Sequence, residues 1–512
     1  MTKRKRVILL VLLVVVITAG AAVVVSVRRL EPRLHAWVTT TLSESLESEV
    51  ELERVHLSWM PLRLGAEKLT VRHHGRTDIP PLLVVSSFAV DLRPLDLWSS
   101  TVEHVVVDGM EINIPPKDPD GKRPMPRRPA RERRESGDVL VRRLTATNTR
   151  LAIHPRQQNK NAKVWDIFEL DMTNVGAADG ASFTAALINP VPYGKIETSG
   201  RFGPWQSTTP GDTPISGEYT FAADLGTIRG LAGQLSASGD MAGTLDQIAT
   251  RGQTHTPDFR LTELDGASVP LETSYDALVD GTEGDVQLKQ VDFTLGESKM
   301  AASGVIEGTQ GLKGKRVILK VTSTDARLGE LLRLVSNKPP PVTGRLMIDA
   351  ALDLPQGDTP VLDRVELAGR VRADRVTFTN DGVQEKIDEL SRRAQGRPHD
   401  EGIDEVASRM AATFTLRRGV FTYRALSFDV RGAKVSLDGT HSLKSKAINL
   451  QGVALLHAPV SKTQTGFRSW LLKPFDPLFR KGGAGTRLAI KVEGTQDQPK
   501  VGLDFGKTLR GR

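Results

Sequence analysis

The chain has 512 residues, enough for about three average domains, but only 39% of them are hydrophobic and 5% aromatic. With 46 Gly, 29 Pro and no Cys, the composition favours many short strands joined by turns, and it excludes disulfide frameworks, iron–sulfur clusters and cysteine nucleophiles. A net charge of +8 is small for this length and is not concentrated in a basic stripe with aromatic residues, so we predict no nucleic-acid partner.

The N-terminus carries a hydrophobic segment. A basic cluster at residues 3–6 precedes Val7–Val27, which contains 21 uncharged residues and as a helix would span about 30 Å. A cleaved signal peptide with its site at Ala19-Gly20-Ala21 is the alternative, but the apolar segment continues beyond that site. We therefore expect a cytoplasmic tip and transmembrane anchor over residues 1–27, with the rest of the chain outside the cytoplasm.

The segment after the anchor begins with a helical pattern. Apolar residues recur at helical spacing over 30–46, and short alternating stretches follow at 50–57 and 102–114. These patterns predict an amphipathic helix and then strands over 28–115. Residues 116–138 are rich in Pro and Arg, which predicts a linker or long loop that has no core of its own.

Alternating apolar residues dominate the part of the chain that follows. Polar partners such as Arg424, Ser427 and Asp429 predict a wetted opposite face, and the change of parity at Arg424-Ala425 indicates a turn or bulge. The residues expected to line the apolar face are Val286, Leu288, Val291, Phe293, Leu295, Phe414, Leu416, Phe421, Tyr423, Leu426, Phe428 and Val430.

Few segments show helical spacing. One helix is expected over 383–394 and a second short one over 403–410. An aromatic-rich element at 467–479 lies between basic residues and is expected to be an end-cap on the sheet or a membrane contact. Its candidate contact residues are Phe467, Trp470, Leu471, Phe475 and Phe479.

A sheet with one apolar face needs something to cover it, and the predicted helices are too few to do so. Either tandem β-sandwiches pack face to face, or one elongated antiparallel sheet curls into a groove filled by apolar material that is not protein. The fold class is mainly β in both cases.

Two regions resemble the AsmA family of bacterial envelope proteins, which are related to TamB. The first includes residues 50–71, VELERVHLSWMPLRLGAEKLTV; the more specific one includes residues 414–452, FTLRRGVFTYRALSFDVRGAKVSLDGTHSLKSKAINLQG, and the closing VEGTQDQPKVGLD. The resemblance implies a chorein-like segment at 28–115, a repeating β-groove at 139–380 and an AsmA-like C-terminal region at 381–512. It also implies a single-pass protein of a Gram-negative inner membrane with a periplasmic body.

No catalytic or cofactor motif is found in the sequence. Gly314-Lys315 lacks the Ser/Thr that completes a P-loop, and the adjacent pair His73-His74 would point to opposite faces of a strand. Gly482–Gly485 precedes a strand rather than a helix, so it is expected to be a flexible connection. We predict no enzyme activity, no cofactor and no metal.

The resemblance implies a phospholipid-binding protein that helps to move lipid between the inner and outer membranes, with an outer-membrane or periplasmic protein as a further partner. A structural factor for the assembly of outer-membrane proteins is the alternative. An envelope hydrolase is disfavoured because no nucleophile and base can be paired.

Overall fold

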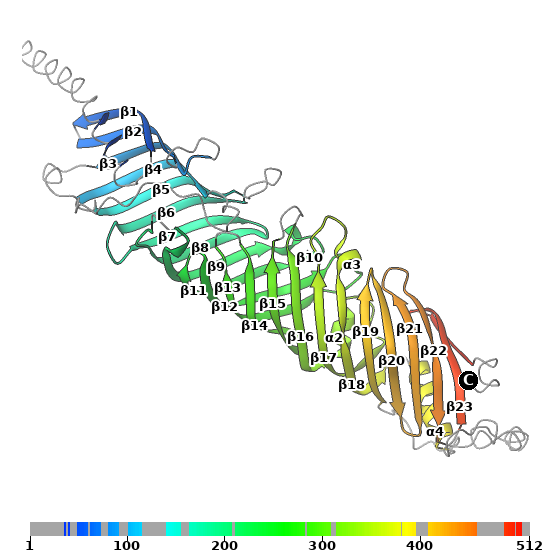
Figure 1. Cartoon of the computed structure of the whole chain (residues 1–512). Helices are drawn as coiled ribbons and strands as arrows, with labels where there is room; N and C mark the ends of the chain where they lie inside the picture. Colours follow the sequence, from blue (N-terminus) through cyan, green and yellow to red (C-terminus); the bar gives the residue numbers. More distant parts are fainter. Residues whose placement is uncertain are drawn as a thin grey trace, which may run out of the picture. The chain divides into compact units, whose positions relative to one another are not determined.

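The computed structural model describes residues 35–36, 39–40, 43, 49–59, 62–72, 80–91, 101–114, 140–154, 163–206, 210–281, 284–308, 314–379, 381–395, 408–457, 486–496 and 498–503. Most of these residues lie in strands, which confirms a mainly β protein (Figure 1). The predicted anchor, the Pro/Arg-rich segment 116–138, His73-His74, Gly482–Gly485 and the aromatic-rich element 467–479 lie outside the described residues. Among the described residues, no helix has the length and hydropathy needed to cross a membrane.

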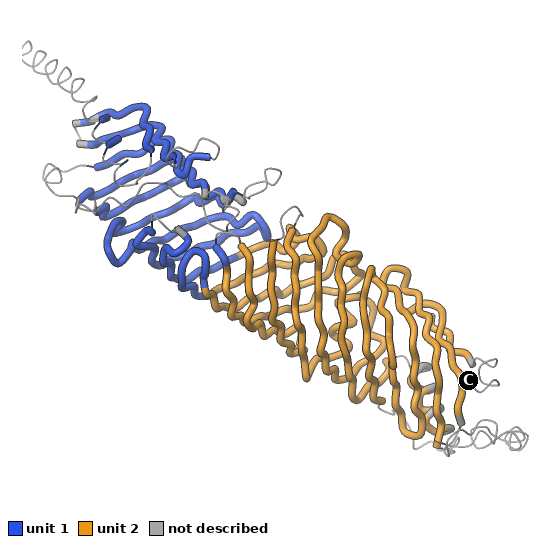
Figure 2. The backbone as a smooth tube through the Cα atoms, viewed as in Figure 1, with its two compact units in different colours: residues 1–221, 239–248, 280–283 blue, residues 222–238, 249–279, 284–512 orange. Residues whose placement is uncertain are grey.

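The chain forms two compact units, coloured separately in Figure 2. Unit 1 comprises residues 1–221, 239–248 and 280–283, and unit 2 comprises residues 222–238, 249–279 and 284–512. Strands β9 (Pro214–Asp224), β11 (Gln234–Thr244) and β12 (Gln247–Leu261) have residues in both units.

Unit 1 is built on a curled sheet of consecutive strands. These are β1 (Glu49–Trp59), β2 (Leu62–Arg72), β3 (Leu83–Asp91), β4 (Thr101–Ile114), β5 (Leu140–Ile153), β6 (Lys163–Val175), β7 (Ala181–Pro190) and β8 (Tyr193–Phe202). Their alternating apolar residues form a cluster around Val71, Val85 and Ala146. The described residues of the predicted helix over 30–46 are helical, and His35 Nε2 lies 2.7 Å from the carbonyl oxygen of Leu52 in β1.

One pairing in unit 1 differs from the expected antiparallel pattern, because β4 and β5 are parallel. A parallel pair needs a long connection that returns the chain to the end where the first strand began. Residues 115–139, which join these strands, provide that length. The segment predicted to be a linker or long loop therefore connects two neighbouring strands of one sheet.

Unit 2 contains the longest run of consecutive strands. They are β13 (Val269–Val279), β14 (Val286–Leu295), β15 (Ser298–Glu307), β16 (Arg316–Arg327), β17 (Val342–Leu354), β18 (Glu366–Phe378), β19 (Ser408–Arg417), β20 (Val420–Val430), β21 (Ala433–Ser442), β22 (Ala447–Leu456), β23 (Thr486–Thr495) and β24 (Gln498–Leu503). Each pairs antiparallel with the next. This continuous pairing belongs to one curled sheet and not to the separated sheets of a sandwich.

Short helices join some of these strands. In unit 2 they are α2 (Leu328–Arg333), α3 (Val361–Arg364) and α4 (Asp381–Ala394), with η2 (Leu225–Thr227) and strand β10 (Leu231–Ala232) also in unit 2 and η1 (Pro210–Asp212) in unit 1. The helix expected over 383–394 is confirmed as α4. The helix expected over 403–410 is wrong at its C-terminal end, because Ser408–Met410 belong to β19, where Met410 pairs with Ala373 and Phe428.

The strands of unit 2 carry frequent bulges. Register shifts interrupt every pairing from β13 to β21, whereas β21–β22 and β22–β23 each run through without a shift. The shift at Arg424-Ala425 was predicted; it is a bulge within one strand, and Ala425 adopts φ 51°. Bulges increase the local twist and bend of a sheet, so they contribute to its curl.

Candidate functional site

The apolar face of unit 2 is organised in rows that cross the strands. Register pairs join residues of successive strands, so that side chains of one face follow each other at about 4.8 Å. We call one of them the leucine row: Leu288, Gly304, Leu319, Leu352, Leu367, Leu416, Phe421, His441 and Ile448. Nine strands contribute to it, which makes it about 40 Å long.

A second row runs beside it, two residues away along most strands and three away on β14, where a register shift lies between Leu288 and Val291. It contains Val291, Ala302, Val321, Ala350, Gly369, Phe414, Tyr423, Gly439, Leu450 and Val492. The two rows together form an apolar strip of mostly aliphatic and aromatic side chains, which glycines, alanines and His441 interrupt.

Most of the leucine row remains partly accessible. Leu352, Leu367 and Phe421 are half-buried, whereas Leu416 keeps only 3% of its surface exposed. The next residues along the strands, such as Ala351 and Ala368, are exposed on the opposite face. A sealed protein core would bury the whole apolar row, so the strip is a partly accessible apolar surface.

The structure places all twelve predicted wall residues on this apolar face, but in different surroundings. Leu288, Leu416 and Phe421 lie in the leucine row, and Val291, Phe414 and Tyr423 in the second row, while Val286 pairs with Ile306. Phe293 and Leu295 belong to a cluster that α2 covers, whereas Leu426 pairs with Leu437. Phe428 and Val430 pack with Ala394 of α4, so helices cover part of the predicted wall.

Aromatic rings gather where β19, β20 and β21 meet. The Phe421 ring lies 5.8 Å from the rings of Phe414 and Tyr423 and 6.5 Å from that of His441, measured between centroids. Burial raises the pKa of Tyr423 to about 12. Burial also lowers the pKa of His441, and a hydrogen bond with Gln496 opposes this effect.

We expect His441 to make the protein less stable in acid. Because its pKa is lower in the folded protein than the usual value of about 6.5, the unfolded chain binds a proton first, and stability is lost as the pH falls below that value. His441→Phe should reduce the fall in Tm between pH 7.5 and pH 5.0. The exposed His457 provides the control, since the Tm of His457→Phe should fall by as much as that of the wild type. An unchanged acid response in His441→Phe would contradict the assignment.

A strap crosses the open side of the sheet in unit 2. It consists of residues 262–268 between β12 and β13. The Glu263 carboxylate accepts hydrogen bonds from the backbone N–H of Val361 (2.8 Å) and Leu362 (2.7 Å) in α3. Four residues later, the backbone N–H of Ala267 donates to the Arg333 carbonyl oxygen at the end of α2 (2.8 Å).

Asp265 adds two further contacts to the strap. It forms an isolated parallel β-bridge with Ser336, and its carboxylate lies 3.3 Å from Lys446 Nζ in the turn between β21 and β22. A Cβ atom at Gly266 would overlap the Leu334 carbonyl oxygen, so the absence of a side chain permits this close approach.

The strap shows how far the sheet is bent. Helix α2 precedes the first residue of β17 and α3 follows its last, and a strand of that length covers about 40 Å. The four residues from Glu263 to Ala267 span at most about 14 Å. They nevertheless contact both the connection that contains α2 and the connection that contains α3. The two rims of the sheet in unit 2 therefore face each other across α2 and the strap.

The polar face of unit 1 brings together three residues that the sequence did not connect. His104 Nε2 lies 2.9 Å from Thr145 Oγ1, and His104 Nδ1 lies 3.3 Å from Asp91 Oδ2. The order hydroxyl, imidazole, carboxylate is that of a catalytic triad. Arg63, however, donates to Asp91 Oδ1 at 2.6 Å and lowers the pKa of that carboxyl group.

Thr145 lies in a strand that is paired on both sides. Strand β5, which carries Thr145, pairs with β4 on one side and β6 on the other, so most of its backbone N–H groups are engaged in the sheet. The three side chains are cross-strand polar neighbours. No group of three or more potential metal ligands occurs within the described part of the chain.

Comparison with known proteins adds no relative. No protein-family model matches the chain, and no curated protein matches it in sequence.

Proposed function

We propose that this protein binds phospholipid acyl chains along the apolar strip of unit 2 and helps to move phospholipids between the inner and outer membranes. The predicted anchor Val7–Val27 would hold it in the inner membrane of a Gram-negative bacterium, with its body in the periplasm. The resemblance to the AsmA family suggests the same function, although no family model matches the chain.

The observation that carries the proposal is the half-buried leucine row. Each acyl methylene that leaves water contributes about 0.8 kcal/mol, so a strip of aliphatic side chains attracts lipid tails without specific contacts. One leaflet of a bilayer core is about 15 Å deep, and the row is more than twice as long. A tail can therefore lie fully on the row and slide from strand to strand with little change in energy.

The mechanism is passive. The strip offers similar side chains at every step, and such a surface does not set a direction by itself. The direction of net transport then follows from the supply and removal of lipid at the two ends.

Site-directed photo-crosslinking in cells tests the proposal. A photoreactive benzoylphenylalanine at Leu367, in the leucine row, should form a phospholipid adduct that mass spectrometry detects. The same residue at Ala368, which is exposed on the opposite face of the same strand, is the matched control. Adducts at neither position, or equally at both, would contradict lipid binding on the strip and favour an assembly role.

A further inference from the structure

The leucine row is closed at two points. Where the register continues into β13, the row member is Ala277, with 2% of its surface exposed, and in β19 it is Leu416, with 3%. The members on β14–β18 between these points are half-buried: Leu288, Gly304, Leu319, Leu352 and Leu367. We call these residues the central stretch. At about 4.8 Å between neighbouring strands, it is about 19 Å long.

Aromatic residues occupy the same two positions in the second row. This row continues from Val291 to Tyr275 on β13, and from Gly369 to Phe414 on β19. The members on β14–β18 are aliphatic or have no side chain: Val291, Ala302, Val321, Ala350 and Gly369. The ring of Phe414 packs against the ring of Phe421, with 5.8 Å between the centroids. Both rows therefore change character at β13 and at β19.

The apolar surface between these two positions is lowest along the second row. Ala350 and Gly369, which are register partners on β17 and β18, add little or no side chain. Larger aliphatic residues of the same face lie on both sides of them along these strands: Leu352, Leu367, Ile348 and Val371. All four are half-buried. A hydrocarbon chain that crosses the strands along the second row would therefore contact larger side chains on both sides.

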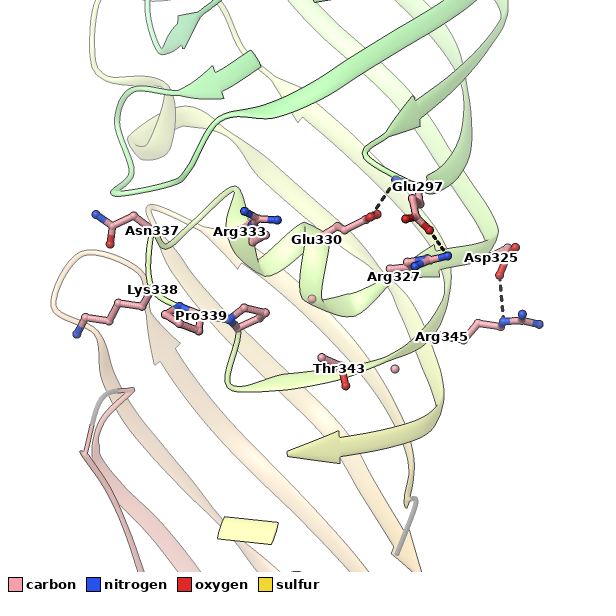
Figure 3. Close-up of a pocket in the computed structure, with 13 residues that line it drawn as sticks. Glu297, Asp325, Arg327, Glu330, Arg333, Asn337, Lys338, Pro339, Thr343 and Arg345 are labelled. Carbon is pink, nitrogen blue, oxygen red and sulfur yellow. Dashed lines mark hydrogen bonds and ion pairs between the residues drawn. The ribbon is translucent and has the colours of Figure 1, made fainter. Parts of the chain in front are cut away.

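Helix α2 closes the apolar face further along the strands. Leu328 and Leu331 of α2 pack against a cluster of buried residues that contains Leu346 of β17. Two polar residues of the same helix, Glu330 and Arg333, line a polar recess instead (Figure 3). A chain on the central stretch can thus extend across the strands but not towards α2.

The length of the central stretch suits one membrane acyl chain. One leaflet of a bilayer core is about 15 Å deep, and a chain that fills this depth fits within about 19 Å. A much longer chain would have to project past Phe414 at one end or past Tyr275 at the other.

We propose that the central stretch holds one acyl chain at a time and that Phe414 limits the length of the chain it accepts. The inference rests on the proposed function and deepens it, because it names the class of lipid, one with chains of ordinary membrane length. The aromatic rings are themselves apolar, so they end this resting position without repelling a tail that moves on.

Crosslinking of the purified full chain in mixed lysophospholipid micelles tests the length limit. Benzoylphenylalanine at Leu367, on the last strand before Phe414, reacts with a chain held there. The micelles contain equal amounts of palmitoyl and lignoceroyl lysophosphatidylcholine, which differ only in chain length, and mass spectrometry measures the two adducts. Each methylene that leaves the micelle without finding an apolar contact lowers binding by a factor of about four, so palmitoyl adducts should exceed the longer lignoceroyl adducts by about tenfold or more.

Phe414→Ala should remove most of this preference. The second row then continues one strand further, by about 4.8 Å, and the share of lignoceroyl adducts should rise by about fivefold or more. Phe414→Tyr keeps the ring and should keep the preference. The matched control is Phe378→Ala, which removes a ring of β18 that contacts Phe428 and lies outside both rows, and it should also keep the preference.

Circular dichroism shows whether each variant is folded. If Phe414→Ala is not, Phe414→Leu, with its shorter side chain, should change the adduct ratio in the same direction. Equal adducts of the two lipids in the wild type would overturn the length limit and leave lipid binding on the strip intact. A wild-type ratio in the folded Phe414 variant, or an equal change in Phe378→Ala, would overturn the role of Phe414. Adducts of neither lipid would overturn the proposed function itself.

Discussion

Leu352→Glu should greatly weaken lipid binding on the strip and leave the protein folded. Leu352 is half-buried in the middle of the leucine row, between Leu319 and Leu367. A carboxylate there meets water when lipid is absent, but must be desolvated when an acyl chain passes. On membrane-insertion scales a buried carboxylate costs about 3 kcal/mol, which corresponds to about a hundredfold loss of affinity.

Ala351→Glu provides a matched control for this variant. It adds the same charge one residue away on the exposed polar face, so lipid binding should be unchanged. The yield of the lipid adduct at Leu367 measures the effect, and thermal melting measures the fold. If Leu352→Glu unfolds while Ala351→Glu does not, the row is a sealed core, because an unpaired buried charge destabilises a core. A folded Leu352→Glu protein with its usual adduct would show that lipid does not use this row.

Locking the strap should stop lipid from passing beneath it. Asp265 and Ser336 are β-bridge partners, and such pairs place Cα atoms at a separation that a disulfide can span. The protein has no Cys, so Asp265→Cys combined with Ser336→Cys adds the only thiols. A headgroup that remains in water at the open side cannot pass a closed strap, so oxidation should slow lipid transfer between vesicles at least tenfold.

Reduction of the same double variant should restore transfer, and each single variant should transfer lipid at the wild-type rate under both conditions. The reduced double variant controls for the loss of the Asp265 contact to Lys446. Transfer that is equally fast before and after reduction would show that lipid enters and leaves without crossing the strap.

The sequence predicts the repeated strands of the fold well, but it predicts contacts between residues far apart in the chain poorly. Alternation places Val286, Leu288 and Phe421 on one face because the period of a strand is two, and the parity change at Arg424-Ala425 reveals the bulge directly. Local rules of this kind need only neighbouring residues. The helix expected over 403–410 shows their limit, because cross-strand partners for Met410 override a short helical pattern.

The strap depends on contacts that no local pattern reveals. Glu263 binds α3 almost a hundred residues further along the chain, and Asp265 reaches Lys446. The parallel pairing of β4 and β5 likewise depends on where a long connection returns.

The uneven distribution of bulges has an evolutionary consequence. In β21, β22 and β23 the register is unbroken, so an inserted or deleted residue would turn every following side chain to the other face and expose the apolar strip to solvent. In β20 the bulge at Ala425 already accommodates one extra residue, and the apolar side chains on both sides of the bulge point to the same face of the sheet. Lineages of this protein should therefore accept changes of chain length at the bulged strands of unit 2 and conserve length across its last regular strands.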